Sequence, residues 1–175
     1  MKVLLEGLLP RLVPCLPFLC VPHEGKQDLE RSIPRKLRAW WEPGVRFVVV
    51  RDNDGGDFRT LKERLAGLCH ETGRQDTLIR IACQELEAWY LGDLKALAAA
   101  YNRPALTGLS SKARYRDHDV VQQPSAELAK LVPEFQKVSG ARLMGSRLSD
   151  DGNLFHSFQA FIDGVRRVAV GFEEA

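Results

Sequence analysis

Acidic residues gather directly after one apolar run of the chain. Residues 45 to 57 read V-R-F-V-V-V-R-D-N-D-G-G-D, so Asp52 and Asp54 follow a run typical of a strand buried on both faces. Carboxylates one residue apart at a strand end can be arranged around a hard divalent cation such as Mg²⁺ or Mn²⁺, and the two glycines let the backbone approach a phosphate. The pattern predicts a metal or catalytic site, with Asp57 as the N-cap of the next helix.

A second acidic pair occurs in the segment Q-E-L-E-A-W, which spans residues 84–89. Acids at the start of a helix also favour its dipole, so Glu85 and Glu87 have a purely structural explanation. Residues two apart on a helix point about 200° from each other, so only one of the two can readily face the acidic turn. Glu87, or alternatively Glu85, is the predicted third ligand, and Asp52, Asp54 and Glu87 are the predicted catalytic residues.

Basic side chains could bind the phosphates of a nucleic acid near this cation. The candidates are Arg51, Lys112, Arg114, Arg116 and Lys137. A solvated polar loop explains the group at 112–116 as well. The formal net charge of +2 and a pI near 8.4 are too mild to indicate nucleic-acid binding by themselves.

Other site types fit the sequence poorly. An EF-hand loop requires an oxygen ligand at position 5 and glycine at position 6. Counted from Asp52, position 5 is Gly56 and position 6 is Asp57, so the two residues stand in the opposite order. The chain has no phosphate loop of the G-x-x-x-x-G-K-[ST] type, no nucleophile setting, and no histidine pair with ligand spacing. A phosphotransfer aspartate of the haloacid-dehalogenase kind remains a minor option.

Alternating helices and strands must position the acidic residues. The predicted elements are a helix at 3–13, a strand at 18–22, a helix at 28–40, a strand at 45–50, a helix at 58–68 and a strand at 77–83. This alternation indicates an α/β fold with a parallel sheet, and ligands of such folds bind outside the carboxyl edge of the sheet.

The remaining chain is predicted to be mainly helical. Helices are expected at 84–93, 94–101, 126–132 and 158–168, with an irregular stretch at 102–124. We expect a single domain over 1–175, with an α/β core at 1–101 and the irregular loop and C-terminal helices at 102–175. The four cysteines form no C-x-x-C pair and indicate a cytoplasmic protein, and prolines and charges break the apolar N-terminal run, so no membrane segment is predicted.

Four segments together resemble the domain-of-unknown-function family DUF4276, which is similar to the Toprim fold of topoisomerases and primases. They are V-V-V-R-D-N-D-G-G-D, I-A-C-Q-E-L-E-A-W-Y-L-G-D, K-A-R-Y-R-D and F-Q-K-V-S-G-A. The resemblance implies a small parallel sheet between helices, Mg²⁺ held by acids at strand ends, and often a role beside an ATPase in phage defence.

The chain departs from this resemblance in two places. Toprim-like proteins carry a glutamate at the end of their first strand, whereas Glu6-Gly7 lies in a segment that reads as a helix. We therefore expect the first strand and its glutamate to be missing from this sequence. The segment G-N-L-F-H-S-F at 152–158 also lacks the Arg and Ser expected there, which weakens any phosphate contact inferred from it.

The leading hypothesis is a Mg²⁺-dependent, Toprim-like nuclease that hydrolyses phosphodiester bonds and partners an ATPase. The first alternative is a non-catalytic interaction or sensor module with the same fold. The second is a small metal-dependent phosphohydrolase.

Overall fold

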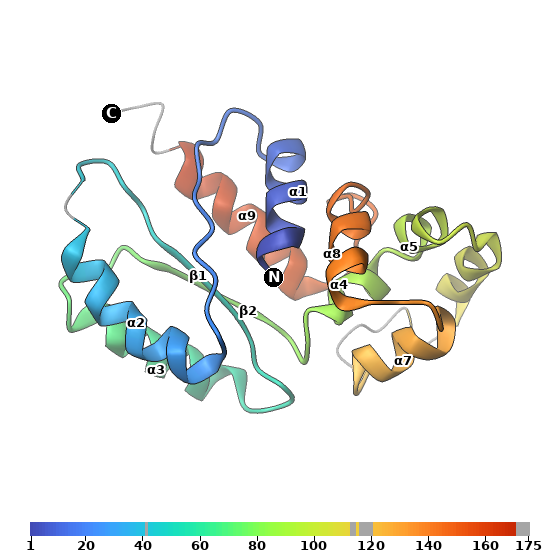
Figure 1. Ribbon diagram of the computed structural model, residues 1–175, viewed down its shortest axis with the longest axis horizontal. Coiled ribbons are helices and arrows are strands. Elements are labelled where there is room, and N and C mark those ends of the chain that lie inside the picture. Colours follow the sequence, from blue (N-terminus) through green and yellow to red (C-terminus); the bar gives the residue numbers. More distant parts are fainter. Residues whose placement is uncertain (41, 113–114, 116–120, 171–175) are drawn as a thin grey trace.

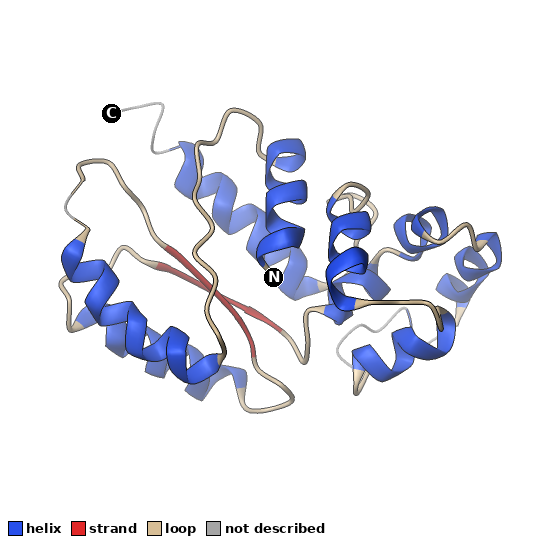
Figure 2. Ribbon diagram, viewed as in Figure 1, coloured by secondary structure: helices blue, strands red, loops and turns tan. Residues whose placement is uncertain are grey.

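The fold is α/β and mostly helical, with two parallel strands in an open sheet (Figure 2). A computed structural model describes every residue except 41, 113–114, 116–120 and 171–175. Strands β1 (Val48–Asp52) and β2 (Leu78–Ala82) pair in parallel, with Val48 opposite Leu78 and Asp52 opposite Ala82. The predicted α/β class with a parallel sheet and a helical C-terminal part is confirmed.

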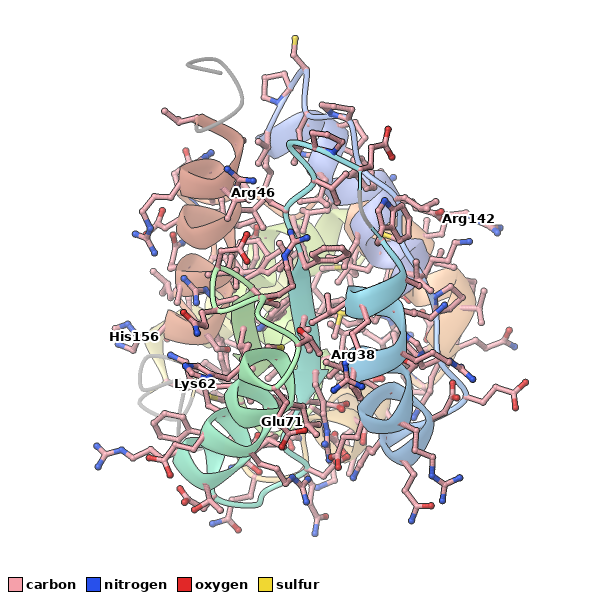
Figure 3. All side chains as sticks on the ribbon, turned by 90° about the vertical axis from the view of Figure 1, so that its left-hand side faces the viewer. Arg38, Arg46, Lys62, Glu71, Arg142 and His156 are labelled. Atoms are coloured by element: carbon pink, nitrogen blue, oxygen red, sulfur yellow. The ribbon has the colours of Figure 1, made fainter. Side chains whose placement is uncertain are left out.

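Helices α2 (Lys26–Ala39) and α3 (Phe58–His70) lie side by side on one face of the sheet (Figures 1 and 3). Successive strand residues point to opposite faces, so Val49 in β1 and two β2 residues face these helices. The resulting apolar cluster consists of Ile33, Leu37, Val49, Leu61, Leu65, Cys69, Ile79 and Ile81. Arg38 also donates a hydrogen bond to the carbonyl oxygen of Glu71, which ties α2 to the end of α3 (Figure 3).

Helices α1 (Lys2–Leu12) and α9 (His156–Val170) cover the other face (Figure 1). Val48 and Val50 of β1 pack against this second, larger apolar cluster but stay half-buried, so the expectation of full burial on both faces is wrong for them. Trp89 is fully buried, stacks on Phe161 and meets Phe158 edge to face.

The other helices lie beyond the ends of the strands (Figure 1). They are α4 (Glu87–Gly92), α5 (Leu94–Ala100), the 3₁₀ helix η1 (Pro104–Ser111), α7 (Pro124–Leu131) and α8 (Lys137–Gly145). Helix α8 packs closely on α1. The approach requires a glycine at position 145, because a Cβ atom there would lie 2.8 Å from the Leu4 carbonyl oxygen. Arg11 of α1 donates to the carbonyl oxygens of Gly145 and Leu148 and so caps the end of α8.

The predicted strand at 18–22 is wrong. This segment forms no strand among the described residues, and Leu19 within it is 71% exposed. Pro17, which precedes the segment, and Pro22, its last residue, lack the N–H group that a strand ladder uses, which disfavours pairing at both ends of the segment.

Other element boundaries also differ from the prediction. β1 begins three residues later than expected and includes Asp52, which therefore ends the strand instead of following it. α4 begins at Glu87 and not at residue 84, since Gln84 has a positive φ of 66° that no α-helix accommodates. The stretch 102–124 was expected to be irregular, but it contains the 3₁₀ helix η1. Helix α8, farther along the chain, was not predicted. In the described part of the chain, no helix combines the length and apolarity needed to cross a membrane.

Candidate functional site

The two strands end at the same level of the sheet, which brings the two acidic segments together. Asp52 is in register with Ala82, the last residue of β2. Beyond that pair, the N–H group of Asp54 donates to the carbonyl oxygen of Gln84 at 2.8 Å. The loop after β1 and the loop after β2 are therefore hydrogen-bonded to each other at the carboxyl edge of the sheet.

Asn53 is the residue that locks these loops together. Its Oδ1 accepts a hydrogen bond from the Gln84 N–H at 2.6 Å, and its Nδ2 donates to the carbonyl oxygen of Gly56. Gln84, Asp54 and Gly55 all have positive φ angles, of 66°, 45° and 77°. Sequence reasoning gave Asn53 and Gln84 no role, although an amide between two aspartates after a strand is a recognisable turn signal.

Asp52 points toward the α1 face of the sheet, since it alternates in step with Val48 and Val50. Partial burial raises the pKa of the Asp52 carboxyl, and the negative charge of Asp54 raises it further, while the Lys26 ammonium opposes the shift. Asp52 is thus a carboxylate that is held in a poorly solvated place beside a second negative charge.

Glu87 comes to the same place from the start of α4. It is 7% exposed, and burial raises the pKa of its carboxyl. The negative charges of Glu85 and Asp52 raise this pKa too, whereas the positive charge of Lys137 lowers it. The structure therefore brings Asp52 and Glu87 within electrostatic reach of each other, with Lys137 at the first position of α8 nearby.

The other two predicted carboxylate ligands have partners in the chain. Asp54 is exposed and forms an ion pair with Lys26, the first residue of α2. Glu85 lies before α4, and its Oε2 accepts a hydrogen bond from the Ser125 N–H at 2.7 Å, in the first turn of α7. Glu85 thus stabilises the start of α7.

Asp57 is confirmed as the N-cap of α3. Its side chain accepts hydrogen bonds from the N–H groups of Arg59 and Thr60, at 3.2 and 3.0 Å. The hydrogen bonds from the Thr60 hydroxyl and N–H, together with that from Arg59, lower the pKa of the Asp57 carboxyl.

The described members of the predicted phosphate-binding group come from β1, the end of η1 and the start of α8. Arg51 faces α2 and α3, on the opposite side of the sheet from Asp52, and forms an ion pair with Glu30. Glu30 also pairs with Arg64 at 2.6 Å. Lys112 is exposed at the end of η1. Arg114 and Arg116 lie outside the described residues.

A cavity of about 470 Å³ lies elsewhere, lined by residues 12–17 at the end of α1 and by Arg166, Ala169 and Val170 of α9. Its lining is mainly apolar and includes no carboxylate. Because the acidic side chains lie at the strand ends, we place the candidate site there.

The donor chemistry at the strand ends fits a hard divalent cation. Carboxylate oxygens are its preferred ligands, and the mutual repulsion of Asp52, Asp54 and Glu87 would be relieved by a positive charge. No three His, Cys, Asp or Glu side chains in the described part of the chain are gathered into a metal shell. Mg²⁺ is commonly held by one or two carboxylates together with waters and substrate phosphates, which this arrangement can supply.

The comparisons with known proteins identify a family. No curated protein and no solved structure matches the chain. The model of the domain of unknown function DUF4276 matches residues 4–166. Because this match covers most of the 175 residues, the chain belongs to the DUF4276 family.

Proposed function

We propose that this DUF4276 protein is a Toprim-like nuclease that binds Mg²⁺ or Mn²⁺ at Asp52 and hydrolyses phosphodiester bonds of a nucleic acid. The observation that carries the proposal is that Asp52, at the end of β1, and Glu87, at the start of α4, repel each other in a poorly solvated place. Such perturbed, mutually repelling carboxylates cluster at functional sites.

The residues have separate roles in this proposal. Asp52 and Glu87 would hold the cation, and the exposed Asp54 would be its third oxygen ligand. Glu85 supports α7 and is the alternative ligand. Lys137 lies beside Glu87 and is the described candidate for contact with a substrate phosphate. When bound, the cation would supply an activated water and neutralise the leaving oxygen.

The first test is metal binding. A cation that binds only the native state at about a hundred times its Kd stabilises it by about 2.7 kcal/mol. For a chain of this length that corresponds to a Tm increase of about 5–11 °C. We expect Mn²⁺ to produce such an increase in the wild type and not in Asp52→Asn. Asp163→Asn, which removes one exposed carboxyl on α9, should respond like the wild type.

The second test is cleavage of single- and double-stranded DNA and RNA in Mg²⁺ or Mn²⁺. Asp52→Asn should lower the rate by about a hundredfold to a thousandfold, which is typical for the loss of one electrostatic group in an active site. Unchanged cleavage and unchanged Mn²⁺ binding in this variant would refute the assignment.

The alternative is a non-catalytic module that partners an ATPase. Asp54 already has a counter-ion in Lys26, and no three-residue metal shell is present among the described residues, which favours this alternative. Absence of any Mn²⁺-dependent Tm shift at millimolar concentration would select it. All four cysteines are free, in keeping with a proposed cytoplasmic location.

A further inference from the structure

Lys26 contacts the candidate site through one direct ion pair. Its Nζ pairs with Oδ2 of Asp54, and the two side chains are 48% and 40% exposed. The pair connects the start of α2 to the loop after β1, although sequence reasoning assigned no role to Lys26. Because both partners are largely solvated, the pair itself adds little to the stability of the fold.

The position of Lys26 is unfavourable for its own helix. A positive charge in the first turn opposes the helix dipole. The N-cap, Gly25, has a φ of 132° and provides no side-chain hydrogen bond to the helix start. The acid that suits this turn is Asp28, which accepts hydrogen bonds from the Glu24 N–H and from His23. Helix formation therefore does not account for a lysine here, whereas the neighbouring carboxylates do.

Two lysines lie near the carboxylates of the candidate site, and each is the first residue of a helix. Lys26 begins α2 and Lys137 begins α8, and each places a positive charge beside a different carboxylate. Lys26 neutralises Asp54 by direct contact, whereas Lys137 acts on Glu87. A divalent cation that binds Asp54 must therefore compete with the Lys26 ammonium, which already contacts this carboxylate.

We propose that Lys26 is a displaceable counter-ion: a divalent cation replaces its ammonium at Asp54, and the released ammonium then binds a phosphate of the nucleic acid. This inference rests on the proposed function. The flexible four-carbon stem and three donors of lysine allow it to exchange one oxyanion partner for another within a few ångströms. The exchange keeps the charge balanced, since each positive group gains a new negative partner.

The prediction is a pair of opposite effects in Lys26→Gln. Without the competing ammonium, Mn²⁺ measured by isothermal titration calorimetry should bind about two- to fivefold more tightly, the range expected for an exposed ion pair. A short fluorescent oligonucleotide, with Ca²⁺ as the hard cation, should bind more weakly. A plot of log K for oligonucleotide binding against log salt concentration should become less steep by about 0.7 to 0.9, the contribution of one phosphate contact. Lys26→Arg retains the charge and should stay close to the wild type in both.

Two controls separate this role from a structural one. Lys62→Gln removes an equal charge from the exposed surface of α3 (Figure 3) and should leave the Mn²⁺ affinity unchanged. In Asp54→Asn, the Lys26→Gln substitution should no longer tighten Mn²⁺ binding, because the contact is already lost. A general loss of stability would weaken both ligands and could not raise the affinity for one of them.

The outcomes distinguish this inference from the proposed function. If the wild type binds no Mn²⁺, the proposed function fails. If the wild type binds Mn²⁺ and Lys26→Gln binds it equally or more weakly, the counter-ion role is overturned. If Lys26→Gln tightens Mn²⁺ binding but leaves oligonucleotide affinity and salt slope unchanged, the transfer of Lys26 to a phosphate is overturned.

Discussion

Asn53→Ala should loosen the junction of the two acidic loops. The substitution removes two hydrogen bonds, one accepted from the Gln84 N–H at 2.6 Å and one donated to the Gly56 carbonyl oxygen. Leaving the half-buried Gln84 N–H without a partner costs about 2 kcal/mol, and the second bond contributes about 1 kcal/mol. The sum of about 3 kcal/mol corresponds to a Tm decrease of about 6–12 °C for a chain of this length.

Thermal unfolding followed by circular dichroism measures this loss. The variant should remain folded at 25 °C, because a domain of this kind has a total stability of about 5–15 kcal/mol. Gln75→Ala, on the exposed segment between α3 and β2, is a control that should change the Tm by no more than about 1–2 °C. Asn53→Asp keeps an acceptor for the Gln84 N–H, so its Tm should lie between those of the wild type and Asn53→Ala. A decrease of under about 2 °C for Asn53→Ala would refute the locking role of this side chain.

Three further substitutions probe helix packing and the site. Gly164→Ala should destabilise the protein by about 0.5–1.5 kcal/mol in urea unfolding, since its Cβ would lie 2.5 Å from the Arg80 guanidinium and displace it from the Ala160 carbonyl oxygen. Gly67→Ala, with open space around it in α3, should stabilise by about 0.5–1 kcal/mol, and equal effects would contradict the packing argument. The raised pKa of Glu87 means that the native state holds its proton to higher pH than the unfolded state, so stability should fall as pH rises from the usual value of 4.5 through the raised one. Glu87→Gln should reduce this decline, leaving the part that comes from the raised pKa of Asp52, and should stabilise the metal-free protein at neutral pH. An unchanged or steeper decline in the variant would contradict the burial and the Asp52 repulsion assigned to Glu87.

The sheet and its helices could be read from the sequence where periodicity was strong. The apolar positions of α3 and α9 recur at helical spacing, and the run in β2 is bounded by turn residues, so these elements formed close to where they were expected. The segment 18–22 has the composition of a strand but pairs with no other strand among the described residues, because composition does not specify a pairing partner.

Helix α8 escaped prediction because its glycines weaken the helical pattern. Gly140 lies under Phe135, where a Cβ atom would be 2.2 Å from the ring, and Gly145 lies against α1. Tertiary packing therefore overrides local propensity here. The same limit applies to the site: Asp52, Asp54 and Glu87 could be proposed from types and spacing, whereas the Lys26 contact requires the folded arrangement of α2 against the loop after β1.

The contact between α1 and α8 sets an order of events during synthesis. The apolar residues Leu4, Leu5, Leu8 and Leu9 of α1 are buried in a cluster completed by residues far along the chain, and the Arg11 hydrogen bonds span 134 and 137 residues. At about 5–20 residues per second, α1 is synthesised roughly 7–27 s before its partner. The leucines of α1 are therefore without their α8 contacts during that interval, and α1 completes its packing only after residue 148 has been made.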